Sequence, residues 1–600
     1  MFWTNYLVRH TRSAIETIRY GGYNPLRPDS RMLAIQKSGT VMLLLYSLIA
    51  TLPILSVFVL LVVARRPAGQ VMPVAYLITV AIALFIWKIP AVEVAAASVQ
   101  GLFATCEILY IVFGATLLLN TLKLSGAIAI IRQSLLGVSR DRRIQVIIIA
   151  WLFGSFIEGA SGFGTPAVIT VPLLVAVGFP AMAAVVAALV IQSTPSTFGA
   201  VGTPLLIGVN TGLDGDLAVQ QHLSELGLTQ AEYLQDVGQW ASLFHGIIGT
   251  FLPLVLVMVM TKGFGDRKSM VDGLALWPFA LFAGLAFTLP YMLIAWFLGP
   301  EFPTLIGGLV GLAIVVPAAR KGWFSPATHW EFPPSEEWPD SWRGQTEIAP
   351  PDCSLPQSMS AFKAWLPYGL LGLFLMLSRL TILPIRSWLQ SSTITWSNIF
   401  GTEATATIQP LYLPPTLFIL VVVITIFLHR MTLKSLGMAA AQTLPILQKT
   451  TLALGAAILM ARVFINTGVN TAGLASMPLT LADGMAAIAG QTWPIFAPLV
   501  GLVGSFVAGS VTVSNLMFSL FQFGVAVKIG ISTAAILGLQ CVGASAGNII
   551  CVSNVVAAES TVGLVGREGL LIRRVLLPTL YYVGFAGVLG GVAIQWMSTL

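Results

Sequence analysis

Long apolar runs are the feature that most constrains the fold of this chain. A helix needs about 20 apolar residues to cross the hydrocarbon core of a bilayer. Twelve runs of about this length lie along the 600 residues, at 40–64, 71–88, 99–121, 181–209, 239–261, 276–297, 304–319, 364–383, 414–429, 450–468, 532–556 and 575–596. Only 9% of the residues are charged, against about 25% in soluble domains, which excludes a soluble enzyme, a nucleic-acid-binding protein and a disordered scaffold. Since barrel strands show a short alternating pattern instead, we expect an all-α polytopic membrane protein with about 12 transmembrane helices.

Basic residues indicate which ends of these runs face the cytoplasm. Lysine and arginine cluster between the runs at 65–66, 140–143, 262–268, 320–321, 430–449 and 567–574, whereas the loop 210–238 carries acidic residues only. Basic loops are normally cytoplasmic. The spans then alternate only if two longer apolar regions, 145–178 and 489–528, each enter and leave on one side of the membrane. We therefore expect two re-entrant hairpins, which bilayers tolerate where protein or a wet cavity surrounds the irregular backbone.

The same pattern divides the chain into four parts. These are a basic N-terminal tail, 1–39, a first membrane half, 40–319, a polar cytoplasmic linker, 320–363, and a second membrane half, 364–600. No small-residue cleavage site follows the first apolar run, so that run is interpreted as a retained span and not as a signal peptide. The alternation of the spans places the basic tail outside, although basic segments, like the six clusters between the spans, are normally cytoplasmic. Location in the plasma membrane, the inner membrane in a bacterium, is expected, and a homo-oligomer is possible.

The two membrane halves share an ordered set of motifs. The segment 154–160, Gly-Ser-Phe-Ile-Glu-Gly-Ala, resembles 504–510, Gly-Ser-Phe-Val-Ala-Gly-Ser. Asn-Thr at 120–121 and at 466–467 precedes each copy. Secondary transporters are often built from inverted repeats whose broken helices meet near the midplane. An inverted repeat is therefore predicted, although small residues are also common at ordinary contacts between membrane helices.

The first glycine-rich cluster is a candidate anion site. Four glycines within residues 154–164 break a helix, and Pro166 suits the first turn of the next helix. A helix N-terminus presents free N–H groups and a positive dipole to an anion. The candidate substrate-binding residues here are Ser161, Gly162, Gly164 and Thr165. The alternative is a packing kink without a ligand.

Two acidic residues within the apolar runs are candidates for proton coupling. Glu158 lies in the first glycine-rich cluster, and Glu107 lies in the run 99–121. A carboxylate at the bilayer centre costs about 2.5–3.5 kcal/mol on insertion scales, so such residues are usually functional. Glu158 could instead cap the hairpin without titrating, and Glu107 could lie near the outer surface in contact with water.

Polar residues in three further segments are candidate substrate ligands. The second cluster contributes hydroxyl and amide groups, and two apolar runs are interrupted by polar residues that would suit unwound helices around a substrate. These candidates are Ser510, Thr512, Ser514 and Asn515, then Gln192, Ser193, Thr194 and Gly199, and finally Gln540, Ser545 and Asn548. The alternative is an ordinary polar contact between helices.

Arg462 lies deep in the run 450–468. Its guanidinium could bind a substrate carboxylate with two hydrogen bonds or neutralise Glu158 or Glu107. A structural arginine that reaches the interface is the alternative.

A different class of function is suggested by Gly-Ala-Ser161-Gly, which matches rhomboid-type intramembrane proteases, with His245 in another span. Serine hydrolysis requires these two side chains within hydrogen-bonding reach. With four cysteines and five histidines and no CxxC motif, we expect no cofactor and no metal.

The segment Glu158-Gly-Ala-Ser-Gly-Phe-Gly-Thr-Pro166 resembles the L-lactate permease family. Supporting segments are Thr194-Pro195, Phe198-Gly-Ala200, Gly509-Ser510, Ser514-Asn515 and Gly563-Leu-Val-Gly-Arg-Glu568. The resemblance implies a plasma-membrane symporter that brings lactate, and often glycolate, into the cell with protons. This chain departs from the family pattern at Val511, where an aspartate is usual, and at Asn548, where a lysine is frequent; Arg462 and Glu107 are candidates to replace these two groups.

The sequence thus predicts a secondary transporter for a small monocarboxylate. Accumulating an anion against a negative interior costs about 2.3 kcal/mol per charge per 100 mV, so a co-transported cation is needed. Glu158 is the predicted proton carrier. The alternative is a sodium-coupled transporter of another organic anion, because uncharged Ser, Thr and Asn side chains could bind Na⁺. Expected partners are therefore a small organic anion with a proton or Na⁺, and the lipid bilayer, but no nucleic acid.

Overall fold

The structure, a computed structural model, describes residues 30–60, 64, 66, 68–135, 137–162, 164–326, 328–344, 359–379, 384–564 and 567–599. Ten helical segments in this part of the chain are long and apolar enough to cross a membrane. The short strands β1 (Ile394–Trp396) and β2 (Ala406–Ile408) pair as an antiparallel hairpin. The all-α polytopic membrane fold is thereby confirmed. Residues 1–29 of the basic tail and 345–358 of the linker lie outside the described residues.

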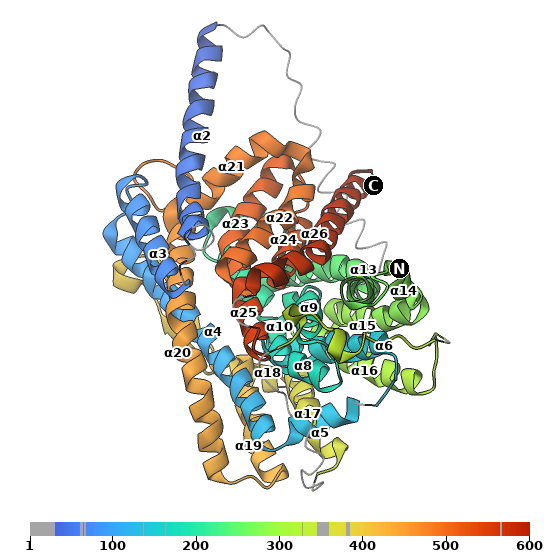
Figure 1. Cartoon of the computed structure of the whole chain (residues 1–600). Coiled ribbons are helices and arrows are strands. Elements are labelled where there is room, and N and C mark those ends of the chain that lie inside the picture. Colours follow the sequence, from blue (N-terminus) through green and yellow to red (C-terminus); the bar gives the residue numbers. More distant parts are fainter. Residues whose placement is uncertain are drawn as a thin grey trace.

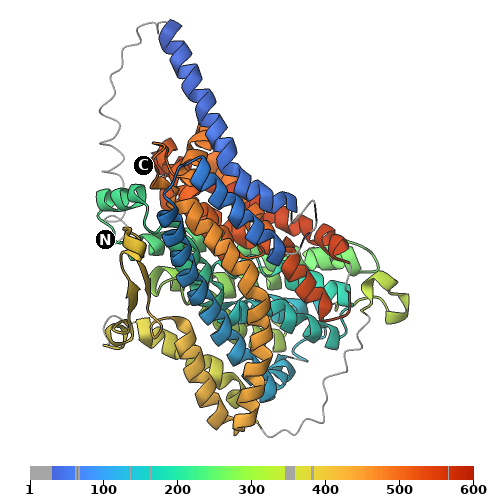
Figure 2. The ribbon, with the colours of Figure 1, turned by 90° about the vertical axis from the view of Figure 1, so that its left-hand side faces the viewer.

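Two very long helices form an arm along one side of the molecule. These are α4 (Ala91–Leu124) and α20 (Leu433–Ile465), which lie side by side in Figures 1 and 2. They approach closely at Gly101, where an added Cβ would lie 3.0 Å from the Leu459 Cα. The helices that contact this arm include α3 (Ala68–Phe85), α5 (Ala127–Leu135), α19 (Pro414–Leu428) and α21 (Met477–Ala489). Behind them, α2 (Ser30–Phe58) packs on α3 and α21, α17 (Ala361–Arg379) packs on α5 and α19, and α18 (Ile385–Gln390) packs on α17.

The first hairpin runs from α6 to α8. It consists of α6 (Arg142–Val146), the π-helix η2 (Ile147–Phe153), α7 (Gly154–Ser161) and α8 (Thr165–Ala176). Its two ends meet, because the Arg142 guanidinium donates to the Val177 carbonyl. It packs against α16 (Pro303–Arg320) through glycines on both sides: a Cβ at Gly159 would lie 2.5 Å from the Leu305 nitrogen. The helices α9 (Ala181–Val190), α13 (Gln230–Phe264) and α15 (Trp277–Phe297) also contact this hairpin. The shorter helices α12 (Leu217–Leu226) and α14 (Met270–Leu274) lie in the same half of the sequence.

The second hairpin consists of α22 (Trp493–Ala508) and α23 (Val511–Ile529). Its ends also meet, because Gln491 Nε2 donates to the Ile529 carbonyl at 2.6 Å. It packs against α24 (Thr533–Ile550), which is followed by α25 (Val552–Ser560) and α26 (Glu568–Thr599). Both apolar regions that are too long for one helix therefore fold back on themselves. That each hairpin enters and leaves on one side of the membrane stays a prediction, as do the boundaries of the two halves.

The interrupted span of the first half is confirmed. Helix α9 ends at Val190, and the chain continues through a turn and the short helix η3 (Ser196–Phe198). It then takes a left-handed path through residues 200–202, within α10 (Gly199–Thr203), before η4 (Pro204–Val209) and α11 (Asn210–Leu213).

In the second half the expected interruption at residues 540–548 is wrong. These residues lie inside the continuous helix α24, and the chain breaks only at Cys551, between α24 and α25. The physical reason is that Gly543 and Gly547 serve close packing: a Cβ on either would overlap the carbonyl of Pro498 or of Leu502 on α22. Glycine there lets two helices touch and does not unwind either one.

The linker between the halves is partly folded onto the membrane domain. Asp141, fully buried at the start of the first hairpin, pairs with Arg143 at 2.6 Å and also accepts the backbone N–H of Trp330 at 3.2 Å. Near the other half, Arg567 donates to the Asp340 carbonyl at 2.9 Å. The described linker residues 328–344 thus contact elements of both halves.

Candidate functional site

The first hairpin turns at two glycines in left-handed conformation. Gly162 (φ 59°) ends α7 and Gly164 (φ 76°) begins α8, so a side chain at either position would be strained. The hydroxyls of Ser161 and Thr165 hydrogen-bond to each other, and Thr165 Oγ1 also donates to the Gly162 carbonyl at 2.7 Å. Pro166 lies in the first turn of α8, as predicted. We call the described residues Ser161, Gly162, Gly164 and Thr165 the first tip.

The second hairpin turns at Gly509 (φ 70°), and Ser510 is the N-cap residue of α23. Ser514 Oγ donates to the Gly501 carbonyl at 2.9 Å, and Asn515 Nδ2 donates to the Pro204 carbonyl at 3.0 Å. Thr512, Ser514 and Asn515 are therefore buried in helix contacts, and of these candidates only Ser510 lies at the turn. We call residues 509–510 the second tip.

One turn of α25 touches both tips. A Cβ at Gly164 would lie 2.8 Å from Asn554 Oδ1, and Ser553 Oγ donates to the Gly509 carbonyl at 3.4 Å. The N-termini of α8, α23 and α25 therefore meet at one place, which we call the tip junction. Three positive helix ends and several hydroxyls can bind a carboxylate without a basic side chain.

Sequence reasoning missed Ser553 and Asn554. A signal was present, because this polar pair lies in the otherwise apolar stretch 549–558 and repeats the Ser-Asn dipeptide of residues 514–515. Ser553 is exposed, whereas the Asn554 side chain is buried. The junction therefore reaches the molecular surface at Ser553.

A hydrogen-bonded chain connects the tip junction to Glu158. Asn554 Nδ2 donates to Asn548 Oδ1 at 2.7 Å, and Asn548 Nδ2 donates to Ser196 Oγ at 3.1 Å. Ser196 Oγ lies 3.1 Å from Glu158 Oε1 and can donate to it. Gln192 supports this chain, since its Oε1 accepts from the amides of both asparagines.

Glu158 is almost completely buried, with 3% of its surface exposed. Its Oε2 has no hydrogen-bond partner among the described residues. Gly199 leaves space for the carboxyl, because a Cβ there would lie 2.8 Å from Glu158 Oε1. A buried carboxyl with one unpartnered oxygen is a position at which a proton can bind.

A second polar group holds the first interrupted span. His245, buried on α13, lies 2.8 Å from Thr197 Oγ1 through Nε2 and 2.6 Å from the Tyr582 hydroxyl through Nδ1. Tyr582 also hydrogen-bonds Thr194 Oγ1 at 2.9 Å, and Ser545 hydrogen-bonds Thr197 at 2.8 Å. His245 is thus engaged away from Ser161, which contacts Thr165, so the arrangement required for serine hydrolysis is not formed.

Two other candidates lie apart from the junction. Ser193 Oγ donates to the Val190 carbonyl in its own segment at 3.0 Å. Gln540 Nε2 donates to Ser514 Oγ at 3.2 Å, inside the contact between α23 and α24. Both side chains therefore stabilise local structure in this conformation.

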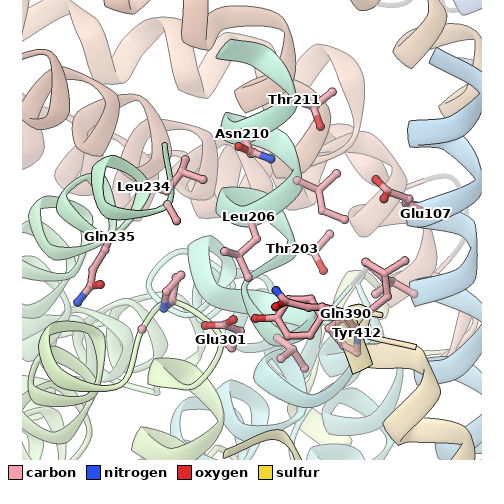
Figure 3. Close-up of a pocket in the computed structure, with 18 of the residues that line it drawn as sticks. Glu107, Thr203, Leu206, Asn210, Thr211, Leu234, Gln235, Glu301, Gln390 and Tyr412 are labelled. Atoms are coloured by element: carbon pink, nitrogen blue, oxygen red, sulfur yellow. The ribbon is translucent and has the colours of Figure 1, made fainter. Parts of the chain in front are cut away.

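Arg462 and Glu107 form a separate charged cluster. Arg462 Nη2 lies 3.4 Å from Asp214 Oδ2, and Glu107 interacts electrostatically with both residues. Glu107 also lines a cavity of about 440 Å³ (Figure 3). The structure thus brings these two candidates together, but beside Asp214 and not beside Glu158.

Known proteins of similar sequence are named as permeases of lactate or glycolate. The model of the L-lactate permease family matches residues 46–596. The chain belongs to this family. It is 29% identical to a putative L-lactate permease of Haemophilus influenzae, over 90% of this chain and 97% of that protein. Identity is 28% to the L-lactate permease of Bacillus subtilis, over 90% and 94%, and 26% to the glycolate permease of Escherichia coli, over 91% and 95%.

Membership of the L-lactate permease family decides the class of protein. Permeases are transporters and not enzymes, and the described part of the chain contains ten segments capable of crossing the membrane. It is therefore a multi-pass transporter of the plasma membrane. Of its two departures from the family pattern, Asn548 takes part in the chain to Glu158, and Val511 begins α23 at the second tip. Arg462 and Glu107 lie in the separate cluster with Asp214.

Proposed function

We propose that this chain is a secondary transporter that brings a small monocarboxylate, lactate or glycolate, into the cell together with a proton. The observation that carries the proposal is the hydrogen-bonded chain between the tip junction and Glu158. A substrate bound at the junction would contact the same asparagines that reach the proton-binding carboxyl. The names of the relatives, L-lactate permease and glycolate permease, support the choice of substrate.

The substrate carboxylate would bind at the helix N-termini of α8, α23 and α25. The Ser510 hydroxyl lies at this place as the N-cap of α23. The Ser161, Thr165 and Ser553 hydroxyls donate to main-chain carbonyls in this conformation and would turn from them to donate to a substrate. The substrate hydroxyl could in turn hydrogen-bond Asn554 Oδ1, which faces Gly164. Recognition by helix dipoles and neutral groups suits an anion with one charge.

The hydrogen-bonded chain of amides and hydroxyls would couple binding of the anion at the tip junction to binding of a proton at Glu158. A proton on Glu158 cancels the charge of the transported anion, which removes the electrical cost of carrying it across the membrane potential. Alternating access would be a rocking or sliding of the unit that carries both hairpins against the arm.

Purified protein in proteoliposomes tests the proposal. We expect lactate counterflow, and uptake that rises with an inward proton gradient; each pH unit supports about tenfold accumulation if one proton accompanies each anion. Absence of lactate and glycolate counterflow in active, correctly inserted protein would refute the substrate. Uptake that is indifferent to the pH gradient would refute the coupling.

Sodium coupling is the second candidate. Buried oxygens of Ser155, Ser505 and Asn515 have no hydrogen-bond partner among the described residues, and such groups can contribute to a sodium site. Sodium-driven uptake that persists in Glu158→Gln would support this alternative. Uptake that ignores an inward sodium gradient at constant pH would reject it.

A further inference from the structure

The cavity beside Glu107 is a second place where the transported anion could bind. It has a volume of about 440 Å³, within the range of small-molecule pockets. Its walls come from α4, η4, α11, α13, the turn before α16, α18 and the segment before α19. Figure 3 shows Glu107, Thr203, Leu206, Asn210, Gln235, Glu301, Gln390 and Tyr412 around it. The charge pattern of the loops assigns this side of the molecule to the outside.

The floor of the cavity is the interrupted span that supports the first tip. Val201 and Thr203 line the cavity, and Gly202 lies between them. On the other side of this segment, a Cβ at Gly162 would lie 2.8 Å from the Ala200 Cβ. The turn 200–202 therefore lies between the cavity and the first tip.

This turn has an unusual backbone conformation. Ala200 (φ 43°, ψ 52°), Val201 (φ 56°, ψ 46°) and Gly202 (φ 76°, ψ 12°) are all left-handed. Such angles are rare for non-glycine residues and especially so for a β-branched valine. Strained backbone of this kind persists where the surroundings enforce it, and it is frequent at ligand clamps and switch regions.

The lining of the cavity fits a small hydroxycarboxylate. Among its described lining residues Arg386 is the single basic side chain, and a guanidinium can bind a carboxylate with two parallel hydrogen bonds. Glu301, Gln235 and Asn210 offer oxygens that could accept from a substrate hydroxyl. The lining carboxylates Glu107 and Glu301 have the same charge as the anion, and Arg462 beside Glu107 offsets part of that charge.

We propose that this cavity is an outer vestibule that binds a small hydroxycarboxylate anion before it reaches the tip junction, and that the turn Ala200–Gly202 is the partition between the two sites. The inference rests on the proposed function, because it takes the vestibule ligand to be the transported substrate. It predicts that bound substrate protects a cysteine in the cavity from a labelling reagent added outside, and that Arg386 determines the substrate concentration needed for this protection.

Thiol labelling in right-side-out vesicles tests the vestibule. The protein carries Leu206→Cys at the cavity wall and Cys106→Ser and Cys353→Ser, while the buried Cys541 and Cys551 are kept. The probe is a membrane-impermeant methanethiosulfonate, and the parent protein without Leu206→Cys gives the background. We expect labelling that saturating lactate slows at least fivefold. Adding Arg386→Gln should raise the half-protecting lactate concentration at least tenfold, whereas Arg386→Lys should raise it less.

Matched measurements separate the outcomes. Thr395→Cys, on the exposed hairpin of β1, should be labelled without protection by lactate. If counterflow persists but Leu206→Cys is not labelled, or if lactate does not slow its labelling, the vestibule is overturned and the proposed function stands. Protection that is equal with and without Arg386→Gln also overturns it. Loss of counterflow in the unsubstituted protein overturns the proposed function itself.

A second variant tests the partition. Ala200→Gly removes a side chain for which the left-handed conformation is unfavourable and which does not line the cavity. We expect the turnover of lactate exchange to change at least threefold while the half-protecting concentration at Leu206→Cys stays within twofold. An unchanged turnover would overturn the role of the turn as a partition.

Discussion

The two hairpins share an architecture but differ in chemistry. Each turns at a left-handed glycine, and each packs through glycines onto a neighbouring helix. The first hairpin carries Glu158, whereas the matching position of the second hairpin is Ala508. The first hairpin also contacts an extended unwound span, whereas the helix break that follows the second hairpin is the single residue Cys551. The two copies therefore share the helical hairpin, and the candidate proton site comes from the residues in which the copies differ.

The largest expected effect tests whether proton coupling belongs to the first hairpin alone. Glu158→Gln should abolish accumulation driven by a pH gradient, because the amide cannot carry the proton. Lactate exchange without a gradient should persist. Ala508→Ser, at the matching position of the second hairpin, is the control and should retain accumulation. Full gradient-driven uptake by Glu158→Gln in proteoliposomes would place the coupling elsewhere.

The next prediction concerns the packing of α24 against the second hairpin. Gly543→Ala should destabilise the protein by about 1–3 kcal/mol, because the new methyl group overlaps the Pro498 carbonyl. Thermal unfolding in detergent measures this loss. The control is Gly569→Ala, where no atom of the described residues lies within 4 Å of an added Cβ. An unchanged melting temperature for Gly543→Ala would show that α22 and α24 separate easily.

Substrate affinity should be sensitive to the hydrogen-bonded chain that leads to Glu158, and insensitive to the contact between α23 and α24. Asn548→Ala removes hydrogen bonds to Ser196 and Gln192 and leaves buried partners unsatisfied, at a cost of about 1–3 kcal/mol. We expect KM for lactate to rise by about 5- to 100-fold. Gln540→Ala is the matched control, and its effect should be on stability with KM within about twofold. Equal KM changes in both variants would remove the distinction.

The smallest expected effect concerns the separate cluster. Asp214 is half-exposed, with 53% of its side-chain surface accessible, so its pair with Arg462 contributes about 0–1 kcal/mol. Asp214→Asn should therefore change KM less than about fivefold. Kinetics at low and high salt provide the measurement. A loss of transport comparable to that of Glu158→Gln would make this cluster part of the coupling machinery.

Much of the fold could be predicted because it depends on patterns within single segments. Apolar runs, basic loops and the repeated Gly-Ser motif gave the membrane helices, and Pro166 gave the start of α8. Interruption of the first span at residues 192–199 was also visible, since polar residues and Pro195 lie in an apolar run.

The remaining features depend on contacts between segments that are distant in sequence. A glycine can unwind a helix or let another helix approach, and Gly543 does the second because Pro498 lies against it. Asn554 was missed because its importance comes from Gly164, 390 residues earlier in the chain. Arg462 could have paired with several acids, and only the folded chain places Asp214 beside it.

The docked part of the linker also limits how the molecule can move. Trp330 is bound to Asp141 at the base of the first hairpin, and Asp340 is bound to Arg567 at the start of α26. A peptide fixed at both ends acts as a brace and not as a hinge. The two hairpins, although they belong to halves joined by a polar connection, therefore lose part of their independent movement on that side and are expected to move as one body against the arm.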